Sequence, residues 1–280
     1  MDAGPGAPHR RAAHRAALPG GGLPPPHRRR RRPHRGAGPV RAVLAQSRAE
    51  LALTLRRGES LLVSFAIPIG ILVFFAEVAP VSTDLDDPVA FLVPGVLALA
   101  VMSTAMVSLA IATGYERRYG VLKRLGSTPL SRGGLLAAKT VNVLAIEVLQ
   151  AVVVVVTGVL LGWEATGGLV LAVVFLLLGT VAFAGIGLLM AGRLRAEATL
   201  ALANGCFLVL LFLGGMAYPL EDLPRILRDV AQVLPAAALS ESVRAACTPG
   251  VAVPTWSVVV LGLWAVGAPV LAARAFRWEE

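Results

Sequence analysis

Six long apolar stretches alternate with short polar segments along most of the chain. They cover about residues 61–79, 89–113, 137–161, 168–192, 199–217 and 254–273. Each is close to the length of about 20 apolar residues that a helix needs to cross the hydrocarbon layer of a membrane. A lone strand in lipid would leave its backbone polar groups unpaired, so these stretches are expected to be helical. The pattern predicts an all-α polytopic membrane protein with six transmembrane helices.

The segments between these stretches differ in charge. Arginines precede the first stretch within residues 41–57, and basic side chains recur at 117–139, in GRLRAEAT at 192–199 and after residue 273. The intervening segments PVSTDLDD at 80–87 and GWEATGG at 162–168 contain no Arg or Lys. Positively charged loops stay on the cytoplasmic side. The alternation predicts a multi-pass protein of a bacterial-type plasma (inner) membrane, with both the N- and C-termini in the cytoplasm.

Composition supports the membrane class and sets the N-terminal segment apart. The 280 residues are 56% hydrophobic and 15% charged, with a mean hydropathy of +0.73 and a net charge of +9. Residues 1–38 are rich in Arg, Pro and Gly, with little to bury, so they are predicted to form a disordered tail. This tail is either dispensable or a contact for anionic lipid headgroups. It has no aromatic residues for stacking on bases, and no nucleic-acid partner is expected. Residues 39–280 form the predicted transmembrane domain.

Two further segments have helical periodicity without the length to span a membrane. Residues 41–57 place Leu44, Leu51 and Leu55 on one side, which predicts an N-terminal interfacial helix. Residues 220–235, LEDLPRILRDVAQVLP, are bracketed by prolines and predict one helix in an extracellular re-entrant segment before the last span. The candidate residues of this outer segment are Pro219, Leu223, Pro224, Ile226, Leu227 and Pro235.

The chain contains no recognisable catalytic set or metal-ligand pattern. GGLLAAKT at 133–140 nearly fits the phosphate-binding pattern G-x-x-x-x-G-K-[ST], but Ala138 stands where the second Gly is needed. Lys139 is therefore interpreted as an anchor at the cytoplasmic end of the third span. We expect a chain that binds no nucleotide by itself, is not an enzyme and has no cofactor of its own. Cys206 and Cys247 lie in different surroundings, and no disulfide is predicted.

Three polar residues fall within the third apolar stretch. Asn142, Glu147 and Gln150 fit on one broad side of a helix, and ionisable groups at membrane depth are candidates for function. Two interpretations stay open. Glu147 is either satisfied by a neighbouring helix, or it lies with Asn142 and Gln150 on a substrate path.

The segment YERRYGVLKRLGSTPLSR at 115–132 interrupts the apolar pattern with a cluster of charges. Tyr115, Tyr119 and Leu122 recur at i, i+4 and i+7, with charged residues over the other faces. This spacing predicts a short amphipathic cytoplasmic helix that ends at GSTP, 126–129. An apolar face beside a charged one is typical of a docking element.

This segment, together with LLFLGGMAYPLEDLPRILRDVAQVLP at 210–235 and the six-span order, resembles the integral-membrane subunits of ABC-2 type ABC transporters. The resemblance covers about residues 41–280 and is closest to the drug-resistance exporter branch. Arg118 departs from the family pattern, in which many members have an acid. The resemblance makes the segment a coupling helix for an ATPase. Its candidate coupling residues are Tyr115, Glu116, Arg117, Arg118, Tyr119, Gly120, Leu122, Lys123, Arg124, Leu125, Thr128 and Pro129.

The resemblance further implies an exporter half that works as a homodimer or heterodimer. Each copy would contact a separate cytoplasmic ABC ATPase, which binds ATP and Mg²⁺, and would move an amphiphilic or hydrophobic substrate such as a drug, lipid or glycolipid-like molecule. Membrane lipid is the remaining expected partner. The alternative is an ion-coupled secondary transporter without an ATPase, which would need several buried charges near the middle of the membrane.

Overall fold

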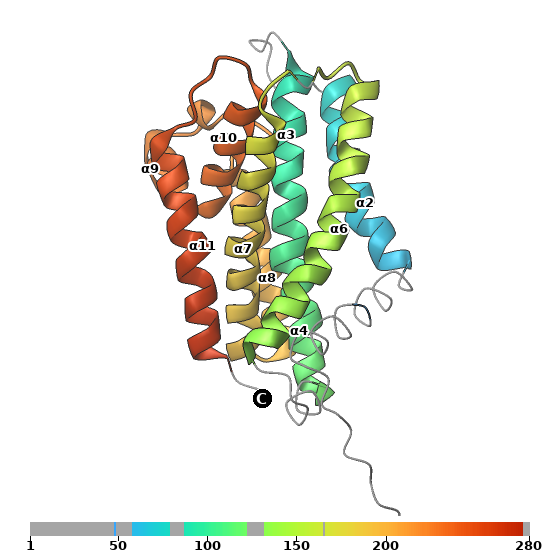
Figure 1. The fold of residues 1–280 in the computed structure, drawn as a ribbon, viewed down its shortest axis with the longest axis vertical. Coiled ribbons are helices and arrows are strands. Elements are labelled where there is room, and N and C mark those ends of the chain that lie inside the picture. Colours follow the sequence, from blue (N-terminus) through green and yellow to red (C-terminus); the bar gives the residue numbers. More distant parts are fainter. Residues whose placement is uncertain (1–47, 49–57, 79–86, 122–131, 165, 277–280) are drawn as a thin grey trace, which may run out of the picture. The chain divides into compact units, whose positions relative to one another are not determined.

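The computed structural model describes residues 48, 58–78, 87–121, 132–164 and 166–276, and all elements within these ranges are helical (Figure 1). The predicted all-α fold is confirmed for this part of the chain. Its α-helices are α2 (Gly58–Val73), α3 (Pro88–Val101), α4 (Leu109–Arg118), α6 (Arg132–Leu160), α7 (Leu169–Arg193), α8 (Ala196–Leu213), α9 (Arg225–Ala231), α10 (Pro235–Cys247) and α11 (Thr255–Ala275). Two π-helical segments, η1 (Phe74–Val78) and η2 (Met102–Ser108), and one 3-10 turn, η3 (Leu220–Asp222), complete the set.

Five of the described helices are long and apolar enough to cross a membrane. They are Pro88–Arg118, Ala138–Leu160, Leu169–Arg193, Ala196–Leu213 and Thr255–Ala275. These correspond to the second through sixth predicted spans, with ends shifted by a few residues. At the first predicted span, 61–79, the described apolar helix Phe65–Glu77 is shorter, so a sixth span stays a prediction. The predicted tail at 1–38 and interfacial helix at 41–57 lie outside the described residues, except for Arg48, which is helical.

The second span is one continuous helix made of three parts. Asp87 caps its start, because its Oδ1 accepts hydrogen bonds from the backbone N–H groups of Val89 and Ala90, each at 3.0 Å. The chain then passes through α3, η2 and α4 without a break and ends at Arg118. The span was predicted to stop at residue 113. It extends further, so the residues from Tyr115 to Arg118 belong to the span and not to a separate helix.

Helix α7 lies at the centre of the bundle and packs against α3, α4, α6, α8, α10, α11 and η2. In Figure 1 it runs between α11 and α3. Its contact with α11 depends on Gly185, where an added Cβ would lie 2.5 Å from the backbone nitrogen of Pro269. A residue without a side chain lets two membrane helices approach closely at this point.

The segment before the last span differs from the single helix predicted for 220–235. Helix α9 starts after Pro224 as expected, but Pro235 is the first residue of a second helix, α10. A proline cannot continue α9 because it lacks an N–H and its ring clashes with the preceding turn, and the same properties suit the first turn of a new helix. Helix α10 is buried along nearly its whole length against α3, α7 and α11.

Helix α9 presents apolar side chains to the surroundings. Ile226 is 78% exposed and Leu227 is exposed too, so the predicted apolar face of this helix is not covered by the described part of the chain. Leu223 is half-buried against a small cluster around Leu220, after Pro219 at the start of η3. The extracellular location of this segment stays a prediction.

Large apolar side chains also cover the outer surfaces of the long helices. Leu160, Val170, Leu263 and Val266 are among the most exposed residues of the structure. In water such a surface would be unfavourable, whereas lipid is its natural solvent. The length of the apolar helices and this surface identify a multi-pass membrane protein.

Candidate functional site

Basic side chains gather at one end of the bundle, where α4 stops, α6 begins and α7 turns into α8. We call this region the basic end; it comprises Arg117, Arg118, Lys139, Arg193 and Arg195. It contains the part of the predicted coupling segment that the structure describes, from Tyr115 to Val121. The remaining candidate coupling residues, Leu122, Lys123, Arg124, Leu125, Thr128 and Pro129, lie outside the described residues.

Glu116 and Lys139 connect α4 to the first turns of α6. The Lys139 Nζ lies 2.6 Å from the Glu116 Oε2. The lysine side chain is 2% exposed and the glutamate side chain 30% exposed, so the cation is the buried member of the pair. Residues 133–140, GGLLAAKT, lie wholly within α6. Lys139 thus belongs to a helix and an ion pair, and not to a phosphate-binding loop.

The two arginines that follow Glu116 contact the turn between α7 and α8. Arg117 is buried and donates a hydrogen bond through its Nη2 to the backbone carbonyl of Leu194. Arg118 is exposed and forms an ion pair with Glu197 in the first turn of α8. Three consecutive side chains of α4 therefore connect it to α6 and to the α7–α8 turn, and we call this set of contacts the α4 clamp (Glu116, Arg117, Arg118).

Helix α4 ends at Arg118, the last residue of the clamp. Tyr119 caps the helix and Gly120 adopts a φ of +69°, a left-handed conformation that glycine tolerates best. Tyr115 and Tyr119 stack with ring centroids 6.2 Å apart. The prediction of one amphipathic helix through Tyr115, Tyr119 and Leu122 is therefore wrong in its continuity, because the chain turns at Gly120.

The surface beside this turn is open. The Tyr119 side chain is 69% exposed, and Val121 is exposed as well. A turn that projects an aromatic and an aliphatic side chain, on a helix end fixed by the α4 clamp, is suited to receive a docking partner. Any displacement of the turn would reach α6, α7 and α8 through the clamp.

Glu147 and Gln150, two of the three polar residues of the third span, contact different helical segments. The Thr180 hydroxyl of α7 donates to the Glu147 Oε2 at 2.5 Å, and the Thr104 hydroxyl of η2 donates to the Gln150 Oε1 at 2.8 Å. Glu147 and Gln150 are buried, and Asn142 is half-buried. The structure thus places Glu147 towards α7 and Gln150 towards the π-helical segment. A substrate path at Asn142, Glu147 and Gln150 stays a prediction.

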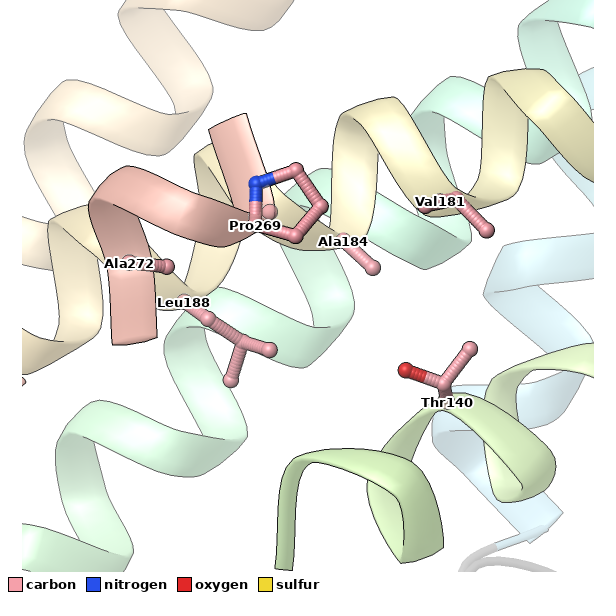
Figure 2. A pocket seen from close by; sticks show the side chains of 7 residues that line it. Thr140, Val181, Ala184, Leu188, Pro269 and Ala272 are labelled. Carbon is pink, nitrogen blue, oxygen red and sulfur yellow. The ribbon is translucent and has the colours of Figure 1, made fainter. Parts of the chain in front are cut away.

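Cavities lie between the helices in the described part of the chain. A cavity of about 110 Å³ lies between α3, α6 and α7, and Glu147 and Thr180 line it. A smaller one, of about 70 Å³, lies nearer the basic end (Figure 2). In that view Thr140 of α6 faces Val181, Ala184 and Leu188 of α7, with Pro269 and Ala272 of α11 beside them.

Sequence reasoning did not identify the residues that complete these contacts. Thr104 and Thr180 are polar residues inside apolar stretches, as Glu147 is, so the search that found Glu147 could have found them too. Leu194 acts through its backbone carbonyl, which no side-chain pattern reveals. Glu197 lies in the predicted loop GRLRAEAT. Only the basic residues of that loop bear on the predicted orientation in the membrane.

Comparison with known proteins agrees with this architecture. Residues 41–247 match the family model described as ABC-2 type transporter. A protein of Bacillus subtilis (strain 168), named "Putative transport permease YvfS", is 26% identical over 201 residues, which cover 68% of this chain and 79% of that protein. The region matched by the family model, residues 41–247, includes the α4 clamp, the cavity at Glu147 and helix α10. With most of its length matched by this model, the chain belongs to the ABC-2 type transporter family.

Proposed function

We propose that the chain is the permease subunit of an ATP-driven exporter, and that it works as a dimer with two copies of a separate cytoplasmic ABC ATPase. The partner binds ATP and Mg²⁺, and the permease moves an amphiphilic or hydrophobic substrate, such as a drug, lipid or glycolipid-like molecule, out of the cytoplasm. In this proposal the basic end faces the cytoplasm, as the distribution of Arg and Lys favours. A place in the drug-resistance branch is part of the proposal.

The observation that carries the proposal is the α4 clamp. A helix end that merely connects two spans has no need for side-chain bonds to other helices, yet Glu116 bonds to α6, and Arg117 and Arg118 bond to the α7–α8 turn. The turn at Gly120 directly follows and exposes Tyr119. The helix end is therefore fixed to the other helices, and the turn after it is exposed to a partner. Both properties are needed if a movement of the partner is to displace the membrane helices.

The mechanism follows from this arrangement. Nucleotide-driven closure of the two ATPase copies would displace the segment after Gly120 in each permease. Since α4 is continuous with η2 and α3, a displacement at Tyr119 would move the whole second span. The clamp would carry the same movement to α6 and to the α7–α8 turn. Rocking of these helices would open a path for the substrate at the dimer interface.

Substrate-stimulated ATP hydrolysis tests the proposal. The chain is first purified from its native host in mild detergent, and a P-loop ATPase should co-purify with it. Tyr119→Ala in the reconstituted complex should then lower the stimulation of ATP hydrolysis without lowering the amount inserted. Ile226→Ala, an equally exposed apolar residue on α9, is the matched control and should leave stimulation unchanged. A chain that transports without any ATPase would refute the proposal.

The buried Glu147 favours a second candidate, an ion-coupled carrier, because carboxyl groups at membrane depth can relay protons. Among the described residues of the spans away from the basic end, it is the acid that is most buried. Transport measured with the proton gradient collapsed and ATP maintained separates the two. Continued transport supports the ATP-driven permease, and loss of transport supports the carrier.

A further inference from the structure

The cavity between α3, α6 and α7 has an apolar lining with one acidic group. Its volume is about 110 Å³, and Glu147 and Thr180 are its polar side chains. The others are aliphatic, among them Leu97 and Val101 of α3, Ala151 of α6 and Leu176 of α7. Small-molecule sites share this character, with apolar walls and a few polar groups that fix orientation.

Half of the Glu147 carboxyl group lacks a partner. Its Oε2 accepts the Thr180 hydroxyl at 2.5 Å, whereas its Oε1 is buried and has no hydrogen-bond partner in the described part of the chain. The side chain is only 7% exposed. A buried acceptor without a donor is unfavourable, so a ligand that donates a hydrogen bond to Oε1 would gain binding free energy. The terminal torsion of a glutamate is soft, and a small rotation of the carboxyl group turns Oε1 towards the cavity.

The missing donor does not come from the cavity walls. Among the described residues, no Lys or Arg lines the cavity, and the one proton of the Thr180 hydroxyl already has two acceptors within reach, Glu147 Oε2 and the Leu176 carbonyl. In the same region the Thr104 hydroxyl donates to Gln150, and neither of these residues lines the cavity. A ligand with an apolar body and one strong donor would complete the site.

We propose that this cavity binds lipophilic amines, with the apolar group of the ligand between α3, α6 and α7 and its ammonium N–H donating to Glu147. A cation is favoured over a neutral donor because it also neutralises the carboxylate in surroundings that otherwise disfavour the charge. Thr180 is a positioning residue that holds the second oxygen. The inference rests on the proposed function, since it names the substrate class of the same exporter.

Direct binding tests the cavity without ATP. The full chain with its ATPase partner is placed in phosphatidylcholine nanodiscs, and equilibrium dialysis measures the binding of radiolabelled N,N-dimethyldodecylamine, with empty nanodiscs subtracted. The neutral counterpart N,N-dimethyldodecanamide has the same chain length and is not protonated. The amine should bind saturably, and the amide at least about tenfold more weakly.

Three variants assign the binding to the cavity. Glu147→Gln should weaken amine binding at least about tenfold, since it keeps the shape and removes the charge. Ala151→Leu leaves the carboxyl group in place, fills the cavity and should also abolish saturable binding. The control Thr104→Val removes a buried hydroxyl of the same region and should leave binding unchanged.

The inference is overturned if the amine binds no better than to empty nanodiscs, if the amide binds as well as the amine, or if both Glu147→Gln and Ala151→Leu bind the amine like the native chain. These outcomes are independent of the exporter proposal, which depends on an associated ATPase and its stimulation. An ATPase that co-purifies with a chain that binds no amine would refute the cavity alone.

Discussion

Lys139 and Glu116 form an asymmetric ion pair, in which the ammonium group is buried and the carboxylate is reached by water. The pair joins the end of α4 to the start of α6, across the loop predicted to dock an ATPase. Because a buried charge depends on its partner more than an exposed one does, the two ends of this pair are expected to respond differently to mutation.

Glu116→Gln should therefore destabilise the protein more than Lys139→Met. We expect the glutamine variant to lose about 1–3 kcal/mol of the free energy of unfolding, because the buried ammonium loses its counter-charge. Lys139→Met removes the buried charge itself and leaves an acid that water can solvate, so its loss should be under about 1 kcal/mol. Denaturant unfolding in detergent micelles measures both. The double variant should resemble Lys139→Met, and the reverse order of the single variants would contradict the assignment.

Arg117 and Arg118 are neighbours of equal charge with unequal roles in the α4 clamp. Arg117 is buried against the Leu194 carbonyl, whereas Arg118 pairs with Glu197 at an exposed surface. Arg117→Ala should cost about 1.5–3 kcal/mol of unfolding free energy, as expected for a buried charged donor. Arg118→Ala should cost at most about 1 kcal/mol, and this loss should shrink at high salt because the pair is solvent-screened. Equal losses would mean that Leu194 does not hold Arg117.

The five longer spans could be predicted from the sequence because they depend on local properties. Length and hydropathy alone decide whether a helix can cross the bilayer. The two-helix arrangement at 220–247 could not be predicted in the same way. The sequence pattern predicts a helix that ends at Pro235, but a proline marks a helix start as readily as a stop. Helix α10 is mixed in polarity and was invisible to an apolar-run criterion.

The side-chain partners within the site could not be predicted from the sequence, because they depend on tertiary structure. Glu116 and Lys139 lie 23 positions apart on different helices, and only packing brings them to 2.6 Å. The break at Gly120 was missed for a local reason. The spacing of Tyr115, Tyr119 and Leu122 suggested one helix, while the glycine between them favours a left-handed stop.

Gly120 should tolerate substitution poorly for a reason of backbone conformation alone. A Cβ at this position meets no atom within 4 Å, yet φ is +69°. Gly120→Ala should thus lose about 1–2 kcal/mol of unfolding free energy from left-handed strain, and Gly120→Asn less. Gly205→Ala on α8 is the matched control, because a Cβ there is equally uncrowded and the backbone is helical. It should cause no loss. A Gly120→Ala variant as stable as the control would argue against the turn.

Gly185 should tolerate substitution poorly for the opposite reason, crowding. A Cβ there would lie 2.5 Å from the Pro269 nitrogen and 2.6 Å from its Cδ, and Gly185 lines the smaller of the cavities described above. Gly185→Ala must push α7 and α11 apart and should cost about 1–3 kcal/mol of unfolding free energy. Gly262→Ala on α11 is the control, because an added Cβ there meets no atom within 4 Å. It should not lower the free energy of unfolding by a comparable amount. Adding Pro269→Ala should recover part of the loss, and a double variant with additive losses would contradict the contact.

The burial of Cys247 can be measured through the pH dependence of the reaction of its thiol. It lies at the end of α10, and burial raises the pKa of its thiol from 9.0 to about 11. The thiolate is the species that reacts with maleimides, so the folded protein should react roughly a hundredfold more slowly at pH 8 than the unfolded chain. The raised pKa also adds stability that is full below the unfolded pKa and is lost as the pH rises from about 9 towards 11.

The Cys206→Ser variant leaves Cys247 as the single thiol of the chain. Mass spectrometry of N-ethylmaleimide labelling between pH 7 and 10 should show a native rate that rises about tenfold per pH unit without levelling off. The same variant unfolded in dodecyl sulfate is the control, and its rate should level off near pH 9. A native rate that levels off there too would show that α10 is not packed in the bundle against α3, α7 and α11, because only that packing removes the thiol from water.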